Sequence, residues 1–365
     1  MPSSRWSGRR ELKRLTSAEK KQHHSGRKIA GVAFSVLLTI GFIWLAFRGA
    51  DLGRMWESIA MSHPGWIAAF IASSLISHYL RALRWGVILN TIKQGTKPFH
   101  LFSSLMIGYG VNNVVPRLGE VTRAVSLGEL ENVSRTSVLG TIVIERVLDI
   151  IFFGLSVIIA ATLYTGDIYQ SVPWLHMTII IGSVSIGIII GGIITAIFFT
   201  GSIKQYQVEL GPGGGFRRRF IEVLLKLIEG FSSLKGIRNY VLTLIYSAGI
   251  MFFYALTSYL GLLVLDMDLI LTVDYLTGWV IMSISSIGIM IPTPGGFGSY
   301  HAITKAALVE LYGFNAEISL AYATMTHATA FLLQISTAVF FFMILRRKYS
   351  FFNSRLFRGF SNDEQ

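Results

Sequence analysis

The stretch "NNVVPRLGEVTR", residues 112–123, closes an apolar run that is long enough to enter a membrane. Pro116 cannot continue the hydrogen-bond ladder of a helix, and Gly119 permits a tight turn. The stretch also carries charged side chains, which are costly inside a membrane unless they have a partner or a function. Whether it is the turn of a broken membrane helix or an ordinary cytoplasmic turn decides the fold of the chain.

The composition is that of a membrane protein. Hydrophobic residues make up 52% of the 365 residues, charged residues only 14%, and the mean hydropathy is +0.56. Soluble domains carry roughly a quarter charged residues. The sequence therefore predicts an all-α, polytopic membrane protein whose apolar segments, each about as long as a bilayer is thick, could all be spans. These segments lie near 29–47, 66–89, 99–115, 137–163, 174–199, 239–265, 275–291 and 316–345.

The positive charge of the chain follows its topology and does not indicate nucleic-acid binding. The net charge of +12 is concentrated in the tails 1–28 and 346–365 and in the loop 200–238. Cytoplasmic segments carry an excess of Lys and Arg, and basic segments are attracted to anionic lipid heads. We therefore expect both tails in the cytoplasm of a plasma-membrane protein, with 29–47 as a retained first span. The absence of cysteine excludes disulfides and thiolate chemistry.

The loop charges do not alternate as eight full crossings require. With eight crossings, 164–173, which has no Lys or Arg, would lie inside, and the basic loop 200–238 would lie outside. Both conflicts disappear if 99–130 enters from the cytoplasm and returns, and if 275–312 enters from the outside and returns. This interpretation predicts about six full spans plus two re-entrant broken helices. The alternative is eight full spans with a weakly obeyed charge rule.

The same order of elements then occurs twice in one transmembrane domain, 29–345. Two spans, a re-entrant hairpin and a further span fill 29–163 and again 174–345, and each half makes three crossings, so the halves have opposite orientations. Inverted repeats with broken helices are a recurring architecture of transporters. In the loop 200–238, between the first two spans of the second half, an amphipathic helix over 216–235 is predicted to be either a lid or a lipid-sensing helix.

The polar residues of the first break form a candidate phosphate site. If a helix starts near Glu120, its free N–H groups favour a nearby anion. Arg117 and Arg123 add guanidinium groups that suit phosphate, and Asn112 and Asn113 offer amide donors. We interpret the group as a cradle for a lipid headgroup, with Glu120 as its internal counter-charge. The alternative is a cytoplasmic turn with snorkelling arginines.

A second charged cluster, "ERVLD" at 145–149, lies inside an apolar span. Glu145, Arg146 and Asp149 can share one helix flank, and charges inside a span usually face the bundle interior and pair. We expect Arg146 to pair with Asp149, and Glu145 to face Arg117 or Arg123. A purely structural ion pair is the alternative.

A third group of polar side chains shares one face of the span 66–89, near its cytoplasmic end. Snorkelling, in which an apolar stem lies in the membrane and the charged head reaches water, explains these side chains equally well. The group consists of His78, Arg81 and Arg84.

The second break is "IPTPGGFGSYH", residues 291–301. Its prolines and glycines predict a loop whose backbone can approach a ligand closely. His301 follows at the expected start of the returning helix, and a lone histidine is more often a structural group than a ligand or a proton carrier. The loop residues are Pro292, Pro294, Gly295, Gly296 and Gly298.

No motif of an enzyme is present in the sequence. There is no HExxH, Walker A or GxSxG motif and no Cys/His spacing of a metal site. We therefore expect no catalytic residue, no cofactor and no metal.

Four motifs, in order along the chain, carry a family resemblance. They are "RALRW" (81–85), "NNVVPRLGEVTR" (112–123), "ERVLD" (145–149) and "PTPGGFGSYH" (292–301). With them the chain resembles the flippase-like family of UPF0104-type integral membrane proteins, also called the lysylphosphatidylglycerol-synthase transmembrane region. The resemblance implies a plasma-membrane protein that acts on lipid.

Two departures from the family pattern affect what the resemblance implies. In two-domain relatives this region is thought to move a lipid made by an attached synthase, but here the sequence ends twenty residues after the last expected span. We therefore expect the synthase domain to be missing. Many relatives carry a Glu after the glycine loop, where this chain has His301, so its substrate can differ from theirs.

The residues and the resemblance together predict a lipid flippase that moves a phospholipid or another phosphate-headed lipid between leaflets. The expected partners are anionic or phosphate-headed membrane lipids and a separate lipid-modifying enzyme. One alternative is the membrane component of a polyprenyl-phosphate-dependent glycosyltransferase, and another is a lipid-binding scaffold that transports nothing. The sequence leaves the lipid species and the oligomeric state open.

Overall fold

The structure of the chain is a computed structural model that describes residues 37–115, 117–164, 236–291 and 293–348, with a few helical positions between 180 and 195. Several features of the sequence lie outside the described residues. They are Pro116, Pro292, most of the expected span 174–199, the amphipathic helix 216–235, the tail 1–28 and most of the tail 346–365.

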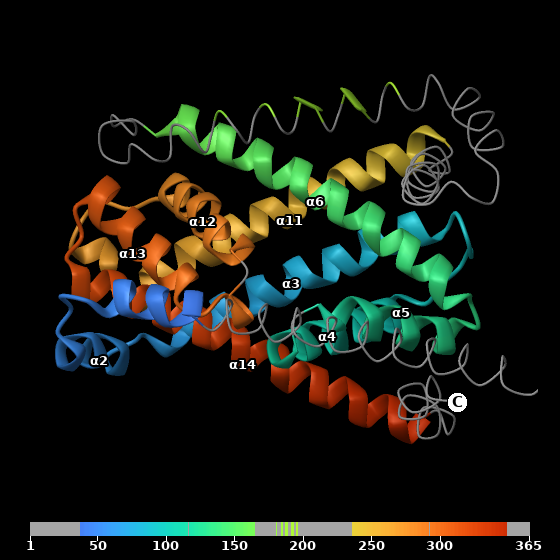
Figure 1. The fold of residues 1–365 in the computed structure, drawn as a ribbon, viewed down its shortest axis with the longest axis horizontal. Helices are drawn as coiled ribbons and strands as arrows, with labels where there is room; N and C mark the ends of the chain where they lie inside the picture. The colour runs from blue at the N-terminus through green and yellow to red at the C-terminus, as the bar shows by residue number, and fades with distance from the viewer. Residues whose placement is uncertain are drawn as a thin grey trace, which may run out of the picture.

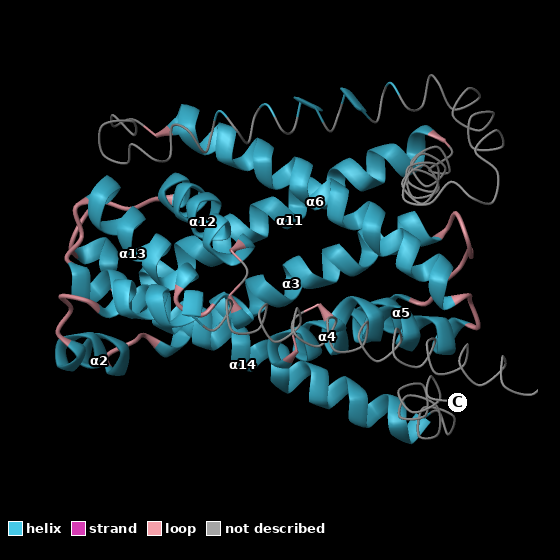
Figure 2. Cartoon of the chain, in the orientation of Figure 1, coloured by secondary structure: helices cyan, strands magenta, loops and turns pink. Residues whose placement is uncertain are grey.

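The described elements are helices (Figures 1 and 2). The first half contains a helix Leu37–Phe47, α2 (Leu52–Ala60), α3 (Pro64–Leu89), α4 (Pro98–Val114), α5 (Leu118–Glu131) and α6 (Arg135–Leu163). The second half contains α11 (Ile237–Val264), the 3-10 helix η1 (Met267–Leu269), α12 (Tyr275–Met290), the 3-10 helix η2 (Pro294–Gly296), α13 (Ser299–Tyr312) and α14 (Ala316–Lys348). The described ranges contain no strand, and the all-α prediction is confirmed.

Local sequence signals explain where several helices begin and end. Pro64 and Pro98 stand at the first positions of α3 and α4. An N–H at this position has no acceptor within the helix, so the missing N–H of proline costs no hydrogen bond. α12 begins at a capping box, in which the Thr277 N–H donates to Asp274 Oδ1 at 2.8 Å. α13 ends at Gly313, whose φ of 78° lies in the left-handed region that closes helices.

Three of the described helices, α3, α11 and α14, are long and apolar enough to cross a membrane. The outer faces of α6, α11 and α14 expose large apolar side chains, which suit contact with lipid tails better than contact with water. Examples are Ile150, Leu155, Ile159, Leu244, Ile245, Phe252, Leu332, Val339 and Phe340.

The first break joins α4 and α5 into a hairpin. Val115 is extended, and Arg117 takes the left-handed conformation with φ 68°, so the turn is made there and not at Gly119, as the sequence suggested. Gly119 instead lies inside α5, where an added Cβ would overlap the Gly108 carbonyl oxygen. It is needed for close packing of α5 against α4.

The second break joins α12 and α13 in the same way. Its glycines supply left-handed backbone, with φ values of 61° at Gly295, 73° at Gly296 and 82° at Gly298. The two helices cross closely at Gly288, where an added Cβ would lie 2.9 Å from the Ser299 carbonyl oxygen. The glycine loop therefore makes the turn that the sequence predicts.

The two hairpins open toward opposite ends of the molecule. At one end (right in Figure 1), the Lys93 ammonium pairs with Glu131 at 2.9 Å, so the chain leaves the first hairpin near the point where it entered. At the other end, the Tyr164 hydroxyl donates to the Leu311 carbonyl at 2.5 Å, beside the last turn of α13. α6 runs from the open end of the first hairpin to the open end of the second. Both breaks therefore lie between these two ends of the molecule.

The tips of the two hairpins meet in the middle of the molecule. A Cβ added to Gly295 in η2 would lie 4.0 Å from the carbonyl oxygen of Asn113 at the end of α4. Two segments about 180 residues apart in the sequence are thereby neighbours.

Single cysteines test whether the chain returns after each break. We expect thiols introduced by Gln94→Cys and Ser134→Cys to react from the same side of the membrane, because both residues are exposed at the open end of the first hairpin. Leu269→Cys and Glu310→Cys, at the open end of the second, should react from the other side. The measurement is labelling of sealed vesicles with an impermeant thiol reagent.

The native chain contributes no background to this labelling because it has no cysteine. Labelling after permeabilisation controls for thiols that are simply unreactive. Eight full crossings would place Gln94 and Ser134 on opposite sides, and that result would contradict the hairpin.

Candidate functional site

A buried ionic network joins α3, α5 and α6. The carboxylate of Glu145 lies at its centre. This side chain is completely buried. The Arg81 Nε–H donates to Glu145 Oε1 at 2.7 Å, and the Arg123 Nη2 group donates to Glu145 Oε2. One carboxylate therefore pairs with guanidinium groups from two other helices.

Asp149, one turn along α6, forms the second centre of the network. Both Arg81 and Arg84 on α3 make ion pairs with its carboxylate. α11 supplies the remaining acceptors, because Arg84 donates to the Ser247 hydroxyl at 3.1 Å and Arg81 donates to the Tyr254 hydroxyl at 3.0 Å. These contacts compensate for the removal of the charges from water, which is expensive for an unpaired ion.

An aromatic side chain supports the network from within the core. The guanidinium of Arg123 lies over the ring of Trp85, 3.7 Å from its centroid. The Trp85 Nε1–H donates to the Thr141 hydroxyl at 2.9 Å, which fixes the ring in place. Trp85 is fully buried, so Arg123 has little freedom to move away.

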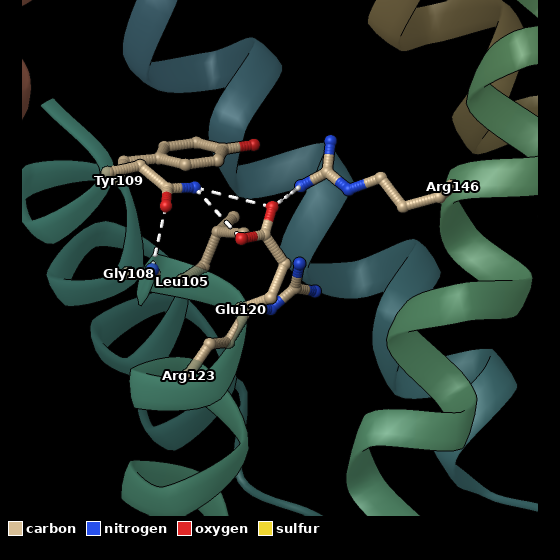
Figure 3. Close-up of a pocket in the computed structure, with 8 residues that line it drawn as sticks. Leu105, Gly108, Tyr109, Glu120, Arg123 and Arg146 are labelled. Carbon is tan, nitrogen blue, oxygen red and sulfur yellow. Dashed lines mark hydrogen bonds and ion pairs between the residues drawn. The ribbon is translucent and has the colours of Figure 1, made fainter. Parts of the chain in front are cut away.

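A second, looser layer of polar contacts lies beside the first break. Asn112 Nδ2 donates to both oxygens of Glu120 at 3.3 Å, and the Gly119 N–H donates to Asn112 Oδ1 at 2.7 Å. Arg146 lies 3.5 Å from Glu120 and 3.5 Å from Asp149. Figure 3 shows the Glu120 carboxylate directed at the Arg146 guanidinium. This layer is partly open to solvent, since the Arg146 and Glu120 side chains are 40% and 29% exposed.

Asn112, Gly119, Glu120 and Arg146 line a narrow hollow between α4, α5 and α6, and no part of it is wide enough for a water molecule. Within the part of the chain that the structure describes, several donors around the hollow have no hydrogen-bond partner: Arg123 Nη1 and Nε, the Tyr109 hydroxyl and Arg146 Nε. Buried polar groups are normally paired, and an unpaired donor carries an energetic cost. The hollow therefore offers unused hydrogen-bond capacity to an anion.

Comparison with known proteins places the chain in a family. The family model described as the lysylphosphatidylglycerol synthase TM region matches residues 29–358. The chain belongs to this family. Together with the apolar helices α3, α11 and α14, the family identifies an integral membrane protein, and it is consistent with a lipid-related role.

Two curated relatives match a smaller part of the chain. A UPF0104 membrane protein of Methanocaldococcus jannaschii is 32% identical over 142 residues, which cover 36% of this chain and 41% of the relative. A UPF0104 membrane protein of Methanothermobacter thermautotrophicus is 28% identical over 138 residues, again 36% of this chain and 41% of the relative. The match thus spans about two fifths of these relatives. No solved structure matches the chain.

The structure brings together most of the charged residues of the family motifs. Of the two arginines that were expected to face Glu145, Arg123 forms the ion pair. Arg146 lies beside Asp149 as expected. Arg81 and Arg84 are buried and ion-paired, so snorkelling does not describe them.

Three residues that the sequence analysis proposed for the site do not line the hollow. Arg117 is exposed and, among the described residues, forms no ion pair. Asn113 donates to Gln334 on α14 at 3.0 Å instead of joining Asn112. His78 is buried behind the hollow, with its ring 5.0 Å from that of Tyr109.

His301 belongs to a separate aromatic cluster at the second break. It is buried, and its ring lies 5.0 Å from that of His327 and 6.3 Å from that of Phe297. Among the described residues, no group of three His, Cys, Asp or Glu side chains could hold a metal ion.

Sequence reasoning missed three uncharged members of the site, Tyr109, Ser247 and Tyr254. Tyr109 had a usable signal, because it lies one turn before Asn112 on the same helix and so on the same face. Ser247 and Tyr254 had none, since nothing in the apolar sequence of α11 distinguishes the face that packs on α3.

Removing the Glu145 carboxylate should destabilise the protein strongly. Glu145→Ala leaves Arg81 and Arg123 buried without it, so we expect the free energy of unfolding to fall by about 3–5 kcal/mol. The measurement is thermal unfolding in detergent, together with the yield of monodisperse protein.

Arg117→Ala is the control for this substitution, because Arg117 is exposed and should change stability by no more than about 0.5 kcal/mol. A Glu145→Ala protein with the stability and yield of the native chain would contradict the assignment of Glu145 as the centre of the network.

Proposed function

We propose that this protein is a lipid translocase, which binds the phosphate of a lipid headgroup in the hollow between α4, α5 and α6 and moves the lipid between leaflets. The observation that carries the proposal is the set of unpartnered donors on Arg123, Tyr109 and Arg146 beside the break between α4 and α5. Guanidinium and hydroxyl donors are the groups that proteins use for phosphate.

The charge of the site supports an anionic ligand. The network holds four arginines and three carboxylates, which leaves one positive charge in excess. The groups are Arg81, Arg84, Arg123 and Arg146 against Glu120, Glu145 and Asp149. The beginning of α5 lies beside the hollow, and the positive end of its helix dipole also favours an anion.

The geometry of the two hairpins supports their interpretation as re-entrant segments of two inverted repeats. They open toward opposite ends, and each contains a close crossing of residues eleven positions apart, Gly108 with Gly119 and Gly288 with Ser299. Non-helical backbone at membrane depth is tolerated where protein or a water-filled cavity surrounds it. In this arrangement the first hairpin enters from the cytoplasmic side of the plasma membrane, where the basic tails also lie.

The hollow is too narrow to hold a phosphate in this structure. Glu120 is the carboxylate held by the longest contacts, at 3.3 and 3.5 Å, and it is partly exposed, whereas Glu145 and Asp149 are buried. A ligand phosphate therefore takes the place of the Glu120 carboxylate among the donors of Asn112 and Arg146. Glu120 is in this proposal an internal anion that the ligand displaces.

The lipid enters and leaves through the open side of the site. Arg117, exposed at the tip beside the hollow, makes the first contact with the headgroup. The tails remain in the bilayer against the exposed apolar faces of α6 and α14. Transport requires no covalent step, and the lipid is supplied by a separate lipid-modifying enzyme.

Arg146 offers the sharpest test of transport. A charge-assisted hydrogen bond is worth roughly 1.5–3 kcal/mol, so we expect Arg146→Ala to lower lipid translocation about ten- to a hundredfold. Its ion pairs are long and partly exposed, so stability should change little. Arg146→Lys keeps the charge and loses the fork, and should retain part of the rate.

The measurement is translocation of a fluorescent phospholipid in proteoliposomes. Arg135→Ala is the matched control, because Arg135 lies on the same helix and pairs with Glu129 away from the hollow. Translocation by Arg146→Ala at the native rate and with normal yield would end the proposal for this site.

The displacement of Glu120 has its own test. Glu120→Gln preserves the size of the side chain but removes the competing charge, so we expect a phosphate-headed lipid to bind about tenfold more tightly. Binding of a short-chain phosphatidylglycerol to the purified protein in detergent measures this, with Glu129→Gln on the same helix as control. Weaker binding by Glu120→Gln would show that the carboxylate is part of the ligand site and not its occupant.

A further inference from the structure

We propose that α14 tethers the tips of both hairpins, with Gln334 and His327 as the positioning residues. Neither residue lines the hollow, and the sequence reasoning assigned no role to either. Asn113 Nδ2, at the end of α4, donates to Gln334 Oε1 at 3.0 Å. His327 Nε2–H donates to the carbonyl oxygen of Gly295, in the second break, at 2.9 Å.

The spacing of the two side chains allows one helix to reach both tips. His327 and Gln334 are seven residues apart, which is close to two helical turns, so they lie on the same face of α14. Ala338, a further turn along this face, packs so tightly on Gly110 of α4 that an added Cβ on the glycine would overlap it. The face that carries the tethers is therefore held against the first hairpin.

The second tether supplies a partner to a backbone group of the break, whereas the first joins two side chains. The last carbonyl groups of a helix and the backbone of a break have no helical hydrogen-bond partner, and inside a membrane they need one. The Gly295 carbonyl finds it in the His327 ring. That ring also packs against Phe297 and Tyr300, with centroid separations of 4.6 and 5.4 Å, so it contacts the tip through three residues.

The two tethers link the breaks mechanically. The tips touch one another at Gly295 and Asn113, and each is bonded to the same rigid helix. A movement that opens either break must release its tether or carry α14 with it. The consequence for translocation, that the first tether must release, rests on the proposed function, whereas the tethers themselves rest on the contacts alone.

A reversible cross-link tests the first tether. The native chain has no cysteine, so Asn113→Cys combined with Gln334→Cys gives a single possible pair. We expect the pair to be joined by oxidation or a short bifunctional thiol reagent. Translocation should then be lost, because a covalently linked tether cannot release, and should return when the link is cleaved.

The control joins the same two helices away from the tip. Phe102 and Phe341 contact one another at the base of α4 and α14, with ring centroids 5.4 Å apart, so Phe102→Cys with Phe341→Cys links them there. This link should leave translocation unchanged. Native-rate translocation by the protein cross-linked at 113 and 334 would overturn the proposal for the first tether.

The second tether is tested without transport, through the accessibility of a thiol in the break. Thr293 is buried at the tip, so the thiol of Thr293→Cys should react slowly. Adding His327→Ala should raise its labelling rate about tenfold, as expected for the loss of one buried hydrogen bond and its packing. His327→Gln can still donate to the Gly295 carbonyl and should restore slow labelling.

Thr329→Ala is the control, since Thr329 lies on α14 and its hydroxyl contacts Met325 and not the tip. Equal labelling rates in His327→Ala and in the native background would overturn the second tether. Because labelling is measured whether or not lipid moves, failure of the tethers is distinguishable from failure of the proposed function.

Discussion

The rest of the structure depends on the requirement that the buried Glu145 carboxylate be paired. It lies in the middle of a long helix, fully removed from solvent, and its partners Arg81 and Arg123 come from α3 and α5. A single ion pair would not compensate for this burial, but two guanidinium groups on two helices do, and each is held in turn by another contact. The first hairpin is therefore positioned by charge as much as by apolar packing. α5 must approach α6 closely enough for Arg123 to reach Glu145, while Gly119 allows α5 to pack closely against α4.

The breaks pose the opposite problem, because they expose backbone groups that no helix satisfies. Side chains from other positions in the chain form hydrogen bonds with these backbone groups. Asn112 accepts from the Gly119 N–H across the first turn, and His327 donates to the Gly295 carbonyl across the second. Such contacts are single hydrogen bonds between neutral groups, which are weaker than the charge-assisted pairs around Glu145. The breaks are accordingly the parts of the fold that can change at least cost, while the ionic network keeps α3, α5 and α6 together.

Much of the fold could be predicted from the sequence, because apolar length and loop charge are properties of single segments. The expected segments 66–89 and 275–291 correspond to Pro64–Leu89 and Tyr275–Met290, and the loop charges predicted a chain that turns back at both breaks. Pairing across helices could not be predicted in the same way. A face of α3 that carries Arg81 and Arg84 looks the same whether it points to solvent or to α6. The choice between Arg117 and Arg123 depended on the left-handed turn at Arg117, a backbone conformation that a non-glycine residue adopts rarely and the sequence does not announce.

The two layers of charge explain how one network can serve both stability and binding. Arg81, Arg84 and Arg123 are each more than nine-tenths buried and pair with Glu145 and Asp149, so displacing either carboxylate would strand buried cations. Glu120 and Arg146 are partly exposed and lie 3.5 Å apart. Water can therefore compensate when this outer pair is broken. An anion that competes for the outer layer meets an attractive field generated by the inner one without having to dismantle it. In the proposed translocase, this arrangement would make binding favourable enough to capture a headgroup and weak enough to release it.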